Sequence, residues 1–204
     1  MSGSRSGTLG EMAEDNFQRI LRKLLEGLPF RRKYAGFHHS RNKSVMERGI
    51  GGSFAESWER LEGVRIRDVR SSEREPPDLL ADDSDGGLVG IELTEFVSQA
   101  AIEANEAGRF CYYAWRDEEA VAELQRIVQT KDAKPFAPTA DSRPYRRRVL
   151  VIHTDEMVAS PGAYRELLGR ASFGPVTQLS DAFLLFSYHP AEGPTYPLIR
   201  LRLA

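Results

Sequence analysis

The chain has 204 residues, of which 41% are hydrophobic and 28% are charged, and its formal net charge is −2. This length fits one domain with elaborations, and the balanced charge excludes a generally basic nucleic-acid coat protein. No apolar run approaches the roughly 20 residues that cross a bilayer, and one cysteine, Cys111, excludes an intramolecular disulfide. We therefore expect a cytoplasmic protein, with residues 1–10 as a flexible leader and residues 11–204 as a single domain.

The first part of the chain predicts two helices with a basic loop between them. Residues 11–28 carry apolar side chains at spacings of three and four, which indicates an amphipathic helix. Residues 30–52 are rich in histidine, arginine and glycine and show no clear period, so we expect mainly loop. A second helix is predicted over residues 53–62, with Ser53 as its N-cap and Gly63 as its stop.

Three strands are expected to follow the second helix. Residues 64–70 alternate apolar and charged side chains over their first positions, as in a half-exposed strand. Residues 77–82 and 87–97 are the next two strand candidates. Between them lies Asp85-Gly86, which favours a tight hairpin turn.

The rest of the chain predicts helices and strands in alternation. The expected elements are a helical region over 99–130 with a break near Gly108, a loop over 131–144, a strand over 148–154, a helix over 161–171, and strands over 181–189 and 196–203. Continuous apolar runs in the strands at 148–154 and 181–189 indicate burial on both faces. Together these elements predict an α/β fold in which helices flank a mixed central β-sheet that contains an antiparallel hairpin.

The predicted hairpin brings acidic side chains together. Side chains alternate between the two faces of a strand, so Glu92 and Thr94 point away from the apolar face that holds Leu93. Asp78, at the start of the preceding strand, can approach Glu92 across the ladder. Two carboxylates and the backbone carbonyl of Leu93 are oxygen ligands suited to a hard divalent cation. Such a cation can activate water and stabilise charge on a phosphodiester.

Pro77-Asp78 followed by Glu92-Leu93-Thr94 on the next strand resembles the PD-(D/E)xK nuclease superfamily. The resemblance covers roughly residues 53–155 and includes the order of helix, three strands, helix and strand. It implies a restriction-endonuclease-like fold and a metal-dependent nuclease that hydrolyses DNA, with RNA as a further possibility. It also implies that Asp78, Glu92 and the Leu93 carbonyl bind Mg²⁺ or Mn²⁺.

The family often completes this site with a glutamate from the preceding helix, for which Glu56 and Glu59 are the candidates and Glu56 is preferred. The chain departs from the family at Thr94, where the pattern has lysine. Three interpretations stay open: the lysine's role has moved to Gln99, Lys43 or an arginine; Thr94 orients water itself; or the site is degraded. In the last case the chain is a nuclease-fold module that only binds nucleic acid or a partner protein.

Basic clusters suggest where a nucleic-acid backbone could bind. The candidate residues are Arg41, Lys43, Arg146, Arg147 and Arg148. A solvated mixed surface is the competing interpretation of each cluster. A homo-oligomer or a larger defence or repair complex is compatible with this prediction, and a membrane partner is not expected.

Structural roles also compete with the catalytic ones. Asp78 could be a turn residue, because Pro-Asp often starts a turn. Glu92 could form an ion pair with an arginine on a neighbouring strand. His153 ends a buried strand, where a histidine more often forms a structural hydrogen bond than contacts a phosphate.

Overall fold

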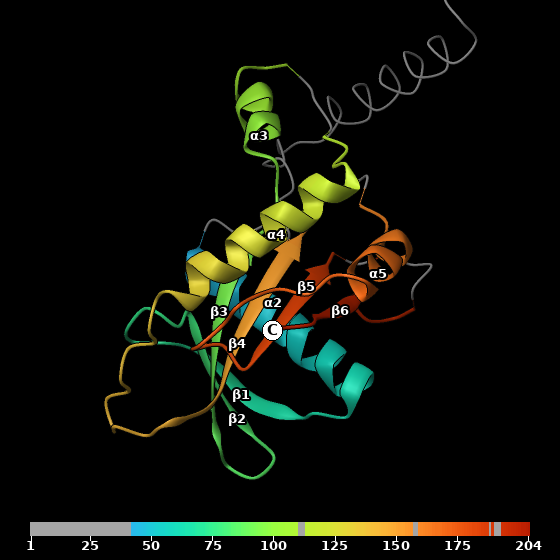
Figure 1. Cartoon of the computed structure of the whole chain (residues 1–204). Coiled ribbons are helices and arrows are strands. Elements are labelled where there is room, and N and C mark those ends of the chain that lie inside the picture. The colour runs from blue at the N-terminus through green and yellow to red at the C-terminus, as the bar shows by residue number, and fades with distance from the viewer. Residues whose placement is uncertain (1–41, 110–112, 157–158, 188, 190–192) are drawn as a thin grey trace, which may run out of the picture.

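The computed structural model describes residues 42–109, 113–156, 159–187, 189 and 193–204 (Figure 1). The predicted leader, the predicted helix over 11–28, Arg41 and Cys111 lie outside the described residues. None of the described helices is long and apolar enough to cross a membrane.

After an initial helix, single strands or groups of strands are separated by helices along the described chain. Their order is α2 (Lys43–Glu62), β1 (Ile66–Ser71), β2 (Leu79–Asp83), β3 (Leu88–Glu95), α3 (Gln99–Glu106), α4 (Asp117–Asp132), β4 (Tyr145–Thr154), α5 (Pro161–Gly169), β5 (Asp181–Phe186) and β6 (Leu198–Leu201). Every predicted strand is present, and the predicted break in the helical region is confirmed, because Gly108 adopts a φ of 73° just after α3.

The strands form one six-stranded sheet in the order β1-β2-β3-β4-β5-β6. The central strands β3, β4 and β5 are parallel, whereas β2 and β6 run antiparallel to their inner neighbours. Helix α2 packs on one face of the sheet, and α4 and α5 cover the other (Figure 1). The predicted α/β class with a mixed, helix-flanked sheet is therefore confirmed.

The predicted tight turn joins β2 to β3. Gly86 adopts a φ of 77°, a left-handed conformation that glycine reaches without strain. The Asp83 side chain accepts a hydrogen bond from Gly87 N at 2.7 Å. Leu79 pairs with Ile91 in this hairpin, so the ladder directs Asp78, one residue before β2, toward Glu92.

Helix α2 begins ten residues earlier than the sequence predicts, at Lys43. Asn42 is its N-cap and accepts a hydrogen bond from Ser44 N at 3.0 Å, whereas Ser53 lies inside the helix and donates to Gly49 O. The glycines that suggested a loop allow close packing instead. A Cβ at Gly51 would lie 2.5 Å from Leu79 Cδ1, so tertiary packing outweighs the low helix propensity of glycine.

Candidate metal centre

A cavity of about 440 Å³ lies where α2, the start of β2, the C-terminal half of β3 and the end of α4 meet. Acidic and basic side chains both line it. The acids are Glu47, Glu75, Asp78 and Glu92. Lys43, Lys131, Lys134 and His153 supply its basic side chains. This mixture of charges indicates a site for ionic chemistry and not for an apolar ligand.

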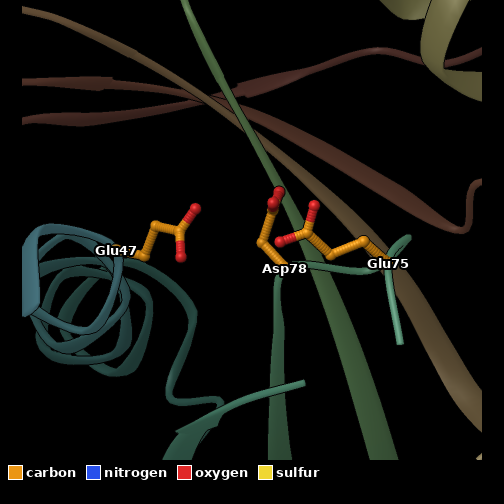
Figure 2. A group of neighbouring side chains, drawn as sticks. All are labelled: Glu47, Glu75 and Asp78. Atoms are coloured by element: carbon orange, nitrogen blue, oxygen red, sulfur yellow. The ribbon is translucent and has the colours of Figure 1, made fainter. Parts of the chain in front are cut away.

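Three of the acids converge at the mouth of the cavity. Glu47 comes from α2, and Glu75 and Asp78 come from the connection between β1 and β2 (Figure 2). One carboxylate oxygen from each lies within 4.8 Å of the other two. Glu47 is buried, Asp78 is half-buried and Glu75 is exposed. Three carboxylates at this separation offer the oxygen ligands that Mg²⁺ and Mn²⁺ prefer.

Asp78 is fixed by the backbone of the neighbouring strand. Its Oδ2 accepts a hydrogen bond from Leu93 N at 2.7 Å. This bond continues the contact between the two strands beyond the pair of Leu79 with Ile91, at which the β2–β3 ladder ends. The bond holds the Asp78 carboxylate beside Glu92, as the sequence predicts, and leaves its other oxygen for a second partner.

Glu92 is deeply buried in the middle of β3, with 7% of its surface exposed. Lys131 Nζ, from the last turn of α4, donates to Glu92 Oε1 at 2.6 Å and to the Leu93 carbonyl at 3.3 Å. Glu92 Oε2 is buried and has no hydrogen-bond donor among the described residues. A buried carboxylate oxygen without a donor carries a desolvation cost that a cation would remove. The oxygen ligands of the site therefore fit a divalent metal.

Two acids of the cavity, Glu47 and Glu92, hold their protons more tightly than ordinary carboxyls do. Burial is the main cause of the raised pKa of Glu92; the hydrogen bond from Lys131 opposes the shift, and the charge of Asp78 adds to it. Burial also raises the pKa of Glu47, with a contribution from Asp78, while Lys43 opposes it. Repulsion among closely spaced carboxylates therefore contributes in both cases. A bound cation would reverse this repulsion.

Lys131 owes its position to a structural anchor at the end of α4. The neighbouring Asp132 is buried and accepts hydrogen bonds from three consecutive backbone amides, those of residues 177–179, at 2.7–2.9 Å. Thr177 Oγ1 donates to the same carboxylate. Although burial acts to raise the pKa of Asp132, these bonds hold it below its ordinary value. The anchor fixes the last turn of α4, and Lys131 with it, against the sheet.

Lys43 lies at the opposite side of the cavity, in the first turn of α2. Its Nζ is 2.9 Å from Glu75 Oε1 and 3.3 Å from Glu47 Oε1. The hydrogen bond to Glu75 is the largest cause of a raised pKa for Lys43. The sequence proposed Lys43 as a replacement for the family lysine, and the structure does place it in the cavity, with its side chain 64% exposed.

Several predicted site residues are not brought to the cavity. Glu56 is exposed on α2, about two and a half turns beyond Glu47, and Glu59 forms an ion pair with Arg65. Gln99 is exposed and donates to Glu103 Oε1. The preference for Glu56 is therefore corrected to Glu47, and Gln99 is removed from the site. The sequence analysis misplaced the acid because it began the helix ten residues late.

Thr94 is half-buried on β3 and does not line the cavity. It lies opposite Ile152 of β4 in the parallel ladder. The position that carries lysine in the family pattern thus lies outside the lining of the cavity, and the proposed role of Thr94 in orienting water stays a prediction.

The predicted phosphate-binding arginines of β4 lie at the far end of that strand. Arg147 is six residues before His153, or roughly 20 Å along an extended strand. Arg147 pairs with Asp181 at 3.3 Å, and Arg146 pairs with Asp83 at 3.1 Å. Arg148 donates to Gln178. These arginines thus lie away from the cavity and are engaged in contacts within the chain, and their predicted role in binding a nucleic-acid backbone stays a prediction.

The sequence analysis missed Glu47, Glu75 and Lys131. Glu75 stands three residues before Asp78 and could have been found as part of the acid-rich stretch around Pro77. Glu47 could have been found from Asn42, because asparagine is a favoured N-cap and a helix that begins after Asn42 includes Glu47. Lys131 has no local signal, because it lies 39 positions from Glu92.

Comparisons with known proteins assign no family to the chain. No family model, curated protein or solved structure matches it. The function is therefore inferred from the geometry of the site and from the arrangement of the elements that carry it.

Proposed function

We propose that the chain is a divalent-metal-dependent nuclease of the PD-(D/E)xK type that hydrolyses phosphodiester bonds, with DNA favoured over RNA. The contact between Lys131 and Glu92 carries this proposal. It supplies an ammonium group beside the acid of β3, although the chain has Thr94 where the family pattern has lysine.

The arrangement of elements supports the same family. A helix, α2, is followed by three strands, by helices α3 and α4 and by strand β4. The two acids of the motif lie on adjacent strands of an antiparallel hairpin. This order and the position of the acids agree with a restriction-endonuclease-like core.

Glu47, Asp78, Glu92 and the Leu93 carbonyl would hold Mg²⁺ or Mn²⁺, with Glu75 at the outer edge. When bound, the metal would lower the pKa of a water molecule and offset negative charge on the phosphoryl group. Burial and the negative charge of Asp78 raise the pKa of Glu47 and of Glu92 although Lys43 and Lys131 oppose the shift, so a repulsion remains that a bound cation would relieve.

Lys131 would act on the reacting groups directly. Its ammonium lies at the inner end of the cavity, bonded to Glu92 and to the Leu93 carbonyl. An ammonium has three donors, so one N–H is left to orient the attacking water or to stabilise charge on a phosphoryl oxygen. The anchor at Asp132 keeps this donor fixed.

Cleavage assays on plasmid DNA, a single-stranded DNA and a matched RNA, with Mg²⁺ or Mn²⁺, test the proposal. Asp78→Asn and Lys131→Met should each lower the cleavage rate at least about 100-fold, as loss of a group that stabilises transition-state charge does. Glu56→Gln is the matched control on α2 and should cleave at the wild-type rate.

Cleavage that survives Asp78→Asn would overturn the assignment of the site. Absence of cleavage by the wild-type protein, together with absence of Mn²⁺ binding by calorimetry, would indicate the degraded module instead. Metal binding without cleavage of any of the three substrates would argue against a nuclease and for a different reaction at the same centre.

A further inference from the structure

A second cavity, of about 300 Å³, lies next to the metal centre. Leu80 of β2 and Leu88 of β3 form part of its wall; Asp78 immediately precedes β2, and Glu92 lies on β3. The connection between β1 and β2 borders both cavities, since Arg74 lines the second and Glu75 the first. A hydrogen bond of 2.6 Å from Ala137 N to the Pro76 carbonyl joins the two loops that separate them.

Three arginines from separate parts of the chain meet in the second cavity: Arg70, Arg74 and Arg143. Arg70 and Arg143 share one carboxylate, that of Asp82, at 2.8 and 2.6 Å. Asp82 thus bridges the two guanidinium groups, and Asp68 also pairs with Arg70 at 2.9 Å. Within the described structure, the hydrogen bonds of Arg70 use Nη1 and those of Arg143 use Nη2, so each group keeps further donors.

Arg74 completes the cationic side of the cavity. Its guanidinium is exposed and forms no ion pair among the residues that the structure describes. Glu73 and Asp141 oppose the arginines from the rim. Asp141 is already engaged, because it accepts a hydrogen bond from Arg143 N at 3.2 Å. Ser72 and Thr139 also line the cavity, and their hydroxyls donate to the carbonyls of Arg74 and Arg143, which fixes the backbone that carries these two arginines.

The remaining wall is aromatic and aliphatic. Tyr145 lines the cavity with Leu80 and Leu88, and its hydroxyl is fixed by a hydrogen bond to the Ala137 carbonyl at 2.8 Å. The edge of its ring contacts Phe136. An aromatic ring beside guanidinium donors is the composition that binds the base and the phosphate of an unpaired nucleotide.

The distance between the two cavities suits one nucleic-acid strand. Leu88, in the second cavity, is four residues before Glu92 on β3, which is roughly 13 Å along a strand. A stacked nucleic-acid strand advances about 3.4 Å per nucleotide. A strand with one phosphodiester at the metal centre would therefore reach the second cavity within about four nucleotides.

We propose that the cavity formed by Arg70, Arg74, Arg143 and Tyr145 binds a nucleotide unit of single-stranded nucleic acid on one side of the phosphodiester that is cleaved. This inference rests on the proposed function and adds a substrate class to it. The arginines hold the phosphate, and Tyr145 contacts the base.

The test is the binding of a fluorescent single-stranded oligonucleotide of about twelve nucleotides, measured by anisotropy in EDTA so that cleavage cannot occur. Arg74→Ala should weaken binding about three- to tenfold at low salt and should reduce the slope of log K against log salt by about 0.7. Arg170→Ala removes an exposed arginine, the C-cap residue of α5, that pairs only with Glu166 in the described structure. This control should bind like the wild type.

A second variant, Tyr145→Leu, should weaken binding without a change in the salt slope, because it removes a stacking surface and no charge. Equal binding by the wild type, Arg74→Ala and Tyr145→Leu would overturn the inference. Tighter binding of a duplex than of the single strand, or equal competition by free mononucleotide, would also overturn it. If binding depends on Arg74 but the protein never cleaves, the nucleotide-binding cavity stands and the proposed nuclease activity is overturned. If Arg74→Ala leaves cleavage unchanged, the nuclease proposal stands and the nucleotide-binding cavity is overturned.

Discussion

Lys131 Nζ lies 2.6 Å from Glu92 Oε1, although 39 positions separate the two residues in the chain. The pair is largely shielded, with side-chain exposures of 21% for Lys131 and 9% for Glu92. A lysine of helix α4 thus pairs with a glutamate of strand β3, which has a neighbouring strand on each side. This arrangement makes Glu92 dependent on Lys131 for its charge.

We expect Lys131→Met to lower the free energy of unfolding by about 1–3 kcal/mol at pH 8, because it leaves a buried carboxylate without its donor. Methionine keeps most of the aliphatic stem, so little packing is lost. Urea denaturation measures the effect. The double variant Lys131→Met, Glu92→Leu should regain much of the loss, since it removes the unpaired charge. A single variant as stable as the wild type at pH 8 would contradict the pairing.

The pH dependence of stability should report the raised pKa of Glu92. Burial, reinforced by Asp78, makes the folded state bind this proton more tightly than the unfolded state does. Between the ordinary glutamate pKa of 4.5 and the raised value, unfolding therefore releases a proton. The stabilising contribution is complete below the ordinary pKa and is lost as the pH rises through the raised one.

Glu92→Gln separates this contribution from those of other groups. Relative to Glu92→Gln, the wild type should lose free energy of unfolding as the pH is raised from about 4.5 to about 8. Glu56→Gln changes an exposed acid of α2 and serves as the control. A difference that stays constant over this range would show that Glu92 has an ordinary pKa.

The sequence predicted one half of the site and not the other, for a physical reason. Asp78 and Glu92 meet because strand alternation and a tight turn over residues 84–87 determine the ladder between them, and both are local properties. Glu47 and Lys131 reach the site through the packing of helices on the two faces of the sheet. That packing depends on side chains far apart in the chain, and no local period encodes it.

Lys43 should compete with a divalent cation for Glu47 and Glu75. Its ammonium contacts both carboxylates, at 3.3 and 2.9 Å, so a metal that binds them must displace it. We expect Lys43→Met to tighten Mn²⁺ binding about two- to fivefold, which corresponds to the typical strength of an exposed ion pair, up to about 1 kcal/mol. Calorimetry in low salt measures the change.

Lys134 also lines the cavity and forms no ion pair among the described residues. Lys134→Met is therefore the matched control, because it removes the same charge without freeing a carboxylate. A larger gain in Mn²⁺ affinity for Lys134→Met than for Lys43→Met would show that the gain comes from removing a positive charge near the site and not from freeing the two carboxylates. Weaker Mn²⁺ binding by Lys43→Met would mean that Lys43 helps to organise the site.

Two neighbouring glycines of α2 provide a test of the packing that brings Glu47 to the cavity. A Cβ at Gly51 would lie 2.5 Å from Leu79 Cδ1 and 2.8 Å from Val69 Cγ1, whereas a Cβ at Gly52 would meet nothing within 4 Å. Leu79 is fully buried and pairs with Ile91 in the hairpin. The two positions share one helix and differ in the space around them.

We expect Gly52→Ala to raise the free energy of unfolding by about 0.5–1 kcal/mol, as replacement of glycine inside a helix does. Gly51→Ala should lower it by about 1–3 kcal/mol, because overpacking outweighs the same gain. Thermal denaturation of both variants gives the comparison. Gly51→Ala should also weaken Mn²⁺ binding, since α2 must move away from β2 and carries Glu47 with it. Equal stabilisation by both substitutions would place α2 farther from the sheet than the structure does, and Glu47 could then not share a metal with Asp78.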